Sequence, residues 1–215
     1  MKVTELNKLY EDFRFGFRGE FDLLVGHVSF ARIFFKNFEP HLKDHRDRET
    51  LILLFEASFV SVALSLNRLW DESTTKNAAL FISFPNLVKH FEEQRFFGCR
   101  SLNEGSAGRK LFEELYKNPL RQRLRVVRTE TIAHTLSIGS SRDRASSDIS
   151  GLSGFNLING EVLDFAEKSI NLLYLVLDDL FDGKISKERD LKALLIIKMQ
   201  EHLRFLGNFS EKVSS

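Results

Sequence analysis

Apolar side chains recur every three or four residues through most of this chain, and this spacing constrains its fold more than any other feature. An α-helix completes a turn in 3.6 residues, so the spacing places these side chains on one face of a helix. Only 3 of the 215 residues are proline, so few positions interrupt the pattern. The longest stripe consists of Leu6, Leu9, Phe13, Phe17, Phe21, Leu24, Val28, Ala31, Phe35 and Phe38.

The helical pattern predicts two long segments near the N-terminus, over residues 6–38 and 47–71. Glycines in the first segment indicate either close helix approach or a bend, because each weakens a helix by about 1 kcal/mol relative to alanine. They are Gly16, Gly19 and Gly26. The predicted core stripe of the second segment consists of Leu51, Leu54, Phe55, Phe59, Val62, Leu66 and Leu69.

Shorter helical segments follow along the chain. One begins near Ser83 and Pro85 and runs to about residue 97, and another begins near residue 111 and is interrupted or kinked at Pro119. Asn159 is a plausible N-cap for a helix that runs to about residue 183, and Ser186 for a last helix. We therefore expect one all-α domain, a bundle of five or six helices, with a long loop over 136–160 and a C-terminal helical extension over 184–215.

Composition narrows the class of protein. The formal net charge is +1, which argues against nonspecific coating of nucleic acid, so any such binding has to be local. The single Cys99 cannot form an intrachain disulfide, and no apolar stretch reaches the ~20 residues of a membrane span. No metal-ligand spacing or phosphate-binding glycine loop occurs. We expect a cytoplasmic protein without a membrane segment, metal or cofactor.

The candidate for chemistry is the segment from Arg128 to His134, which lies late in a basic helical run and is followed by a serine-rich loop. Six positions on an ideal helix correspond to a rise of about 9 Å and to different faces. One straight helix therefore does not direct both side chains to one point. They converge on a phosphate if the helix frays beside His134, or if two copies of the chain contribute across a dimer axis.

At these residues the chain resembles the HEPN superfamily (higher eukaryotes and prokaryotes nucleotide-binding), whose helical domains carry an Arg, four to six intervening residues and a His. Here five residues intervene. The run Asn67-Arg68-Leu69-Trp70-Asp71 is similar to the Arg-Leu-aromatic-Asp signature of the AbiU-like branch, which is linked with abortive phage infection. The resemblance covers most of the chain, from about Leu6 to Leu180, and implies a role in prokaryotic defence or toxin-antitoxin biology.

The resemblance also implies a homodimer, an RNA substrate, a cognate antitoxin or defence partner, and metal-independent endoribonuclease chemistry. Arg128 would neutralise the scissile phosphate, and His134 would transfer a proton. Many active members have Asn, Asp or His directly after the Arg, whereas this chain has Thr129, which would orient and not react. Arg125 would support Arg128, while Arg68 and Asp71 either pair with each other or brace the site.

Two other interpretations remain open. A cationic Arg and His near a helix C-terminus interact favourably with its dipole by roughly 0.3 to 1 kcal/mol and require no substrate. The same helical surface would also suit a noncatalytic module that holds RNA, a nucleotide or a protein partner. The arginines at 121, 123, 125 and 128 favour contact with an RNA backbone, whereas a solvated charged face is the simpler explanation.

Overall fold

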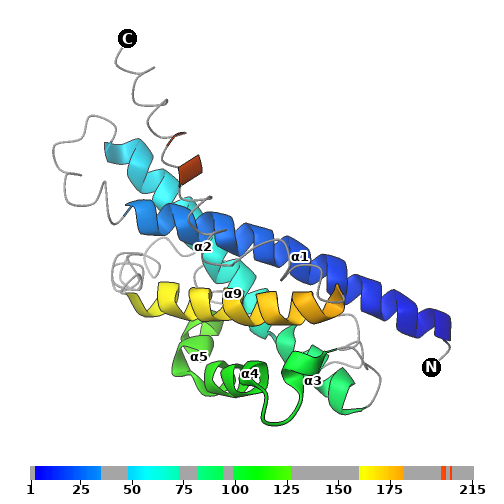
Figure 1. The fold of residues 1–215 in the computed structure, drawn as a ribbon. Helices are drawn as coiled ribbons and strands as arrows, with labels where there is room; N and C mark the ends of the chain where they lie inside the picture. The colour runs from blue at the N-terminus through cyan, green and yellow to red at the C-terminus, as the bar shows by residue number, and fades with distance from the viewer. Residues whose placement is uncertain are drawn as a thin grey trace, which may run out of the picture.

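The computed structural model describes residues 3–34, 48–72, 82–93, 99–126 and 160–181, together with 200, 201 and 204. Within these ranges the chain forms six α-helices and a 3₁₀ turn, and no strand, which confirms the predicted all-α class (Figure 1). The helices are α1 (Val3–Ile33), α2 (Arg48–Trp70), α3 (Phe84–Glu92), α4 (Ala107–Lys117), α5 (Pro119–Val126) and α9 (Gly160–Leu180), and the turn is η4 (Arg100–Leu102). The predicted loop over 136–160, apart from Gly160, and nearly all of the predicted 184–215 extension lie outside the described residues.

Helix α1 buries the predicted stripe almost completely. Six stripe residues are at most 5% exposed, and they are Phe13, Phe17, Phe21, Leu24, Val28 and Ala31. Leu9 is only partly buried against the core, and the side chains of Leu6, Phe35 and Phe38 lie outside the described residues. This face packs against α2 and α9, and Figure 1 shows α9 running below α1 while α2 crosses behind it. The two long helices α1 and α2 are antiparallel, since Glu20 pairs with Arg68 and His27 contacts Ser58.

Helix α9 closes the bundle against α1 at several points of its length. The hydroxyl of Tyr10 donates to the carbonyl of Leu180 at 2.6 Å, across 170 positions of sequence. At the other end of both helices, Arg32 of α1 binds Asp164 and Glu167 of α9, each at 2.8 Å. The first and last described helices of the chain are therefore held together directly.

The predicted core stripe of α2 is correct for most of its described side chains and wrong for Leu54. Phe59, Val62, Leu66 and Leu69 are buried, whereas Leu54 is 39% exposed. Leu54 precedes the exposed Arg68 by fourteen residues, nearly four helical turns, so the two share the outer face of α2. Every residue from Leu51 to Phe55 is apolar, so this part of the helix has no polar side that marks the exposed face. The side chains of Leu51 and Phe55 lie outside the described residues.

Gly16 is the glycine at which close approach is required. A Cβ atom at this position would lie 2.4 Å from Cδ1 and 2.9 Å from Cγ2 of Ile82, the residue two positions before α3. Gly19 and Gly26 have no heavy atom within 4 Å of the equivalent point. Close approach therefore explains Gly16, and steric contact explains neither of the other two glycines.

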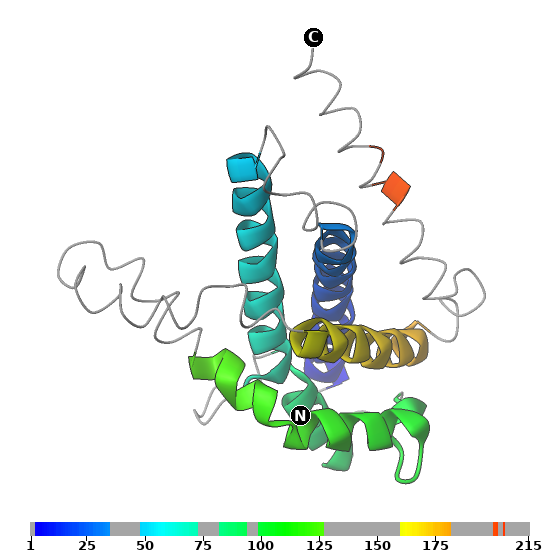
Figure 2. The ribbon, with the colours of Figure 1, turned by 90° about the vertical axis from the view of Figure 1, so that its left-hand side faces the viewer.

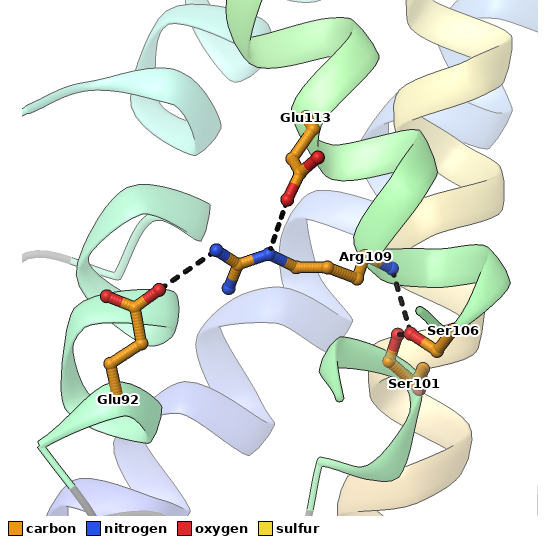
Figure 3. Close-up of polar contacts among 5 residues, drawn as sticks. All are labelled: Glu92, Ser101, Ser106, Arg109 and Glu113. Carbon is orange, nitrogen blue, oxygen red and sulfur yellow. Dashed lines mark hydrogen bonds and ion pairs between the residues drawn. The ribbon is translucent and has the colours of Figure 1, made fainter. Parts of the chain in front are cut away.

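The short helices begin at side-chain caps. Ser83 accepts a hydrogen bond from the backbone of Asn86, with Pro85 in the first turn, as the sequence predicts for the start of α3. Ser106 accepts from the backbone N–H of Arg109 at 3.1 Å and so begins α4. Figure 3 shows Arg109 reaching from α4 to Glu113 of the same helix and to Glu92 of α3, each at 2.9 Å. This guanidinium fixes α3 beside α4.

Pro119 separates α4 from α5, as predicted. Helix α4 ends at Lys117, and the side chain of Asn118 accepts the backbone N–H of Leu120 at 2.9 Å to begin α5. Figure 2 shows α5 and α4 together below α9, with α5 leading away past the C-terminal end of α2. None of the helices formed by the described residues combines the length and apolar character needed to cross a membrane.

Candidate functional site

The predicted motif begins just beyond the described part of α5. Helix α5 ends at Val126, two positions before Arg128. Arg128, Thr129 and His134 lie outside the described residues, and so does the side chain of Arg125, whose backbone belongs to α5. The structure therefore defines the base from which the motif segment departs, which is α5 and the C-terminal end of α2.

Asn67 of α2 anchors α5 at its C-terminal end. Its side-chain Nδ2 donates to the carbonyl of Ala63 at 2.8 Å and to the carbonyl of Leu124 at 2.9 Å. Leu124 belongs to the last described turn of α5. Asn67 is only 7% exposed, so this hydrogen bond is shielded from water. It fixes the end of the helix from which residues 127–134 continue.

A second connection joins the two helices on the polar side. Arg121 of α5 binds the carboxylate of Glu72, which follows α2 directly, at 2.9 Å. The same guanidinium lies 4.1 Å above the centre of the Tyr116 ring, a cation–π contact. The pKa of Tyr116 is raised, chiefly by its hydrogen bond with Glu72 and also by burial. Arg121 is therefore neutralised by its partners, so this arginine adds little to any positive surface.

Trp70, the only tryptophan in the chain, lies in the core beneath these polar groups. Its indole Nε1 donates to the hydroxyl of Ser169 on α9 at 3.0 Å. Its ring lies within 6 Å, centre to centre, of three phenylalanines from three other elements, Phe84, Phe112 and Phe165. The Trp of the Arg-Leu-aromatic-Asp run therefore holds α2 against α3, α4 and α9.

Asp71 borders a cavity of about 210 Å³ between the C-terminal end of α2 and α5. Its apolar wall comes from the core side of α2, α5 and α9, and its polar rim from residues at the ends of α2 and α5. The lining residues are Leu66, Asn67, Trp70, Asp71, Glu72, Arg121, Gln122, Leu124 and Phe165. The sequence prediction included only Asp71 of this group among the site residues.

Arg68 lies elsewhere on α2. Its Nε and Nη2 donate to the two carboxylate oxygens of Glu20 on α1, at 2.6 and 3.1 Å, and Nη2 also donates to Ser65. Arg68 is not among the residues that line the cavity. Two charged residues of the Asn67–Asp71 run therefore make different contacts. Arg68 joins α2 to α1, whereas Asp71 borders the cavity beside α5.

Comparison with known protein families gives a match for this chain. The family model HEPN AbiU2, described as AbiU2, matches residues 16–195. The chain belongs to the HEPN AbiU2 family. The AbiU2 match includes α2 with its Asn67–Asp71 run, the anchored α5 and the whole of the Arg128–His134 segment. Comparison with curated proteins gives no match, and comparison with solved structures gives none either.

The sequence did not predict that Asn67, Glu72 and Arg121 fix α5. A polar Asn within the apolar second half of α2 was a usable signal, because a buried amide requires partners. No sequence pattern indicates that Glu72 meets Arg121, since 49 positions separate them. Among the described residues, no three His, Cys, Asp or Glu side chains gather where a metal ion would bind.

Proposed function

We propose that this AbiU2 protein is a homodimeric, metal-independent endoribonuclease of prokaryotic defence, with Arg128 and His134 as its catalytic residues. The observation that carries the proposal is the rigid base of the motif: Asn67 and Glu72 fix α5 from two sides, directly before Arg128. Catalytic groups need supports that hold them near their reacting geometry. Family membership supports the same function.

Each motif residue has a role that suits cleavage of RNA. Arg128 binds the scissile phosphate through a charge-assisted pair of hydrogen bonds. His134 removes the proton of the ribose 2′-hydroxyl or delivers one to the leaving oxygen, since a histidine titrates near neutral pH. Thr129 orients these groups, and Arg125, Arg68 and Asp71 support them. Because one straight helix separates Arg128 from His134, two chains supply the site together.

The test is cleavage of structured and single-stranded RNAs in EDTA by wild type, Arg128→Ala and His134→Ala. Both variants should lose activity, and loss of a general acid or base lowers the rate by roughly 10²- to 10⁴-fold. Arg100→Ala, which removes an exposed arginine of η4, is the matched control and should cut normally. Cleavage that survives both motif substitutions would contradict the assignment.

The shared site has its own test. If Arg128 of one chain acts with His134 of the other, mixing the two inactive variants creates dimers with one complete pair, and activity returns. If the mixture stays inactive although the two variants exchange subunits, Arg128 and His134 of the same chain form each site. Light scattering at micromolar concentration should show a dimer, and a monomer that cuts RNA would exclude the composite site.

A noncatalytic module that binds RNA, a nucleotide or a protein partner is the second candidate. Thr129 favours it, since many active members have Asn, Asp or His at this position. Neutralisation of Arg121 by Glu72 also reduces the charge available to an RNA backbone. In this case wild type leaves RNA intact and binds it with a strong dependence on salt. Absence of both cutting and binding would direct attention to a protein partner.

A further inference from the structure

The outward face of α1 presents apolar side chains to solvent. Phe15 is 68% exposed and Leu23 is 45% exposed. A helix turns by about 100° per residue, so both lie within an arc of about 80° that also contains Gly19, Gly26 and Phe30. We call these five residues the outer stripe, because they lie opposite the buried stripe of the same helix. Phe30 is partly buried against the core. Contiguous apolar surface that is exposed in this way typically marks an interaction site.

Packing within the described chain does not account for the two glycines of the outer stripe. Beyond the backbone of its own helix, a Cβ atom at Gly19 or Gly26 would have no heavy atom within 4 Å. Both residues nevertheless lie inside a helix of 31 residues, where glycine weakens the helix relative to alanine. A residue without a side chain lets a second backbone approach closely. The two glycines therefore fit contact with another molecule.

The outer stripe runs from Phe15 to Phe30, and its spacing is symmetric. Each phenylalanine lies 7.5 positions from the midpoint of this segment, and Gly19 and Gly26 each lie 3.5 positions from it. A contact across a two-fold axis uses the same surface on both copies, so that residue i meets j and j meets i. An antiparallel second copy of α1 would therefore place Phe15 beside Phe30 of the other copy, and Gly19 beside Gly26. The outer stripe thus matches itself.

The charged residues beside the outer stripe also suit a second copy. Arg18 and Asp22 form an ion pair at 3.1 Å, and both side chains are exposed. In the antiparallel arrangement, Asp22 lies about five positions, or roughly 7.5 Å along the axis, from Arg18 of the other copy. Within one chain the two residues are four positions apart. Each carboxylate is therefore within reach of two guanidinium groups, and the four side chains together carry no net charge.

We propose that the outer stripe is a contact surface for a second copy of this chain, with the two α1 helices antiparallel and centred between Asp22 and Leu23. The segment Phe15–Phe30 is about 22 Å long and a helix is about 10 Å wide, so the contact is smaller than the ~800 Å² per partner of a stable complex. The pairing is therefore transient. Figure 1 shows α5 on the far side of α9 from α1, so this surface is separate from α5 and the inference goes beyond the proposed function.

Engineered cysteines, oxidised with diamide, test the contact and its direction. Facing Cα atoms of two packed helices lie about 3.5 to 5.5 Å apart, which permits a disulfide, whereas a separation above about 7 Å does not. Leu23→Cys should form a covalent dimer, because position 23 lies at the centre of the contact. Phe15→Cys alone should not, since its two copies are about 22 Å apart along the axis. A mixture of Phe15→Cys and Phe30→Cys should cross-link.

Controls separate this contact from random collision and from misfolding. Burial raises the pKa of the native Cys99 thiol to about 12, so this cysteine stays unreactive. Lys110→Cys, at an exposed position of α4, should not cross-link. Adding Phe15→Glu to Leu23→Cys brings a charge against apolar surface and should slow cross-linking roughly tenfold or more, whereas adding Lys110→Glu should not. Far-ultraviolet circular dichroism verifies that each variant is folded.

The outcomes distinguish this inference from the proposed function. No cross-link in Leu23→Cys, or an equal cross-link in Lys110→Cys, overturns the contact, and ready cross-linking of Phe15→Cys with itself overturns its antiparallel direction. If RNA is cut through Arg128 and His134 without the Leu23→Cys cross-link, the nuclease stands and the contact is wrong. If the cross-link forms as expected and wild type cuts no RNA, the contact stands and the nuclease is wrong.

Discussion

Replacement of glycines in α1 by alanine tests how closely this helix approaches the segment before α3. Gly16→Ala and Gly19→Ala both gain about 1 kcal/mol from helix propensity. Only the methyl group at position 16 meets a neighbour, at 2.4 and 2.9 Å from two carbons of Ile82. Overpacking of this kind costs typically about 1–3 kcal/mol. The two variants should therefore differ by about 1–3 kcal/mol in their free energy of unfolding.

The measurement is thermal and urea unfolding followed by circular dichroism, with Gly26→Ala as a second control in open space. In a protein of this size the predicted difference corresponds to roughly 2–12 °C in Tm. Gly19→Ala and Gly26→Ala should stabilise the protein, and Gly16→Ala should not. Equal stabilisation by all three alanines would refute the close approach of Ile82 to α1.

Two further perturbations address the anchor of α5 and a half-buried histidine. Asn67→Ala leaves the carbonyl of Leu124 without this partner and should lower the free energy of unfolding by about 1–3 kcal/mol, measured by urea unfolding. The control Asn171→Ala, at an exposed position of α9, should change the free energy of unfolding by less than about 0.5 kcal/mol. Burial lowers the pKa of His27 in the folded protein below 6.5. Its contribution to stability is therefore complete above pH 6.5 and is lost as the pH falls through the pKa of the folded protein. His27→Gln should flatten this part of the pH profile of the free energy of unfolding, and an unchanged profile would assign the dependence to other groups.

The sequence predicted the helices well because periodicity reports burial directly. The stripe of α1 from Phe13 to Ala31 is buried as expected, and Ser83 and Pro119 mark real boundaries. Side-chain identity determines these features locally. The orientation of α2 at Leu54 was wrong, since uniformly apolar sequence does not define which face is inside.

The site was less accessible to sequence reasoning because it depends on contacts between distant residues. Asp71 was predicted as a supporting residue of the site, and its place on a cavity wall depends on where α5 packs. The predicted pairing of Arg68 with Asp71 was inferred from their spacing on one helix alone. In the structure Arg68 binds Glu20 on α1. The assignments of Arg128, Thr129, His134 and Arg125 stay predictions.

The contacts between α1 and α9 also determine when this protein can finish folding during its own synthesis. Tyr10 cannot bind the carbonyl of Leu180 until that residue has been synthesised, 170 positions later, and Arg32 cannot bind Glu167 until 135 positions later. At about 5–20 residues per second a ribosome needs roughly 7 to 34 s to supply the partners. During that interval α2 is available to cover part of the phenylalanine-rich face of α1, and the rest stays exposed. The nascent chain therefore leaves part of this apolar face exposed until its last described helix has emerged.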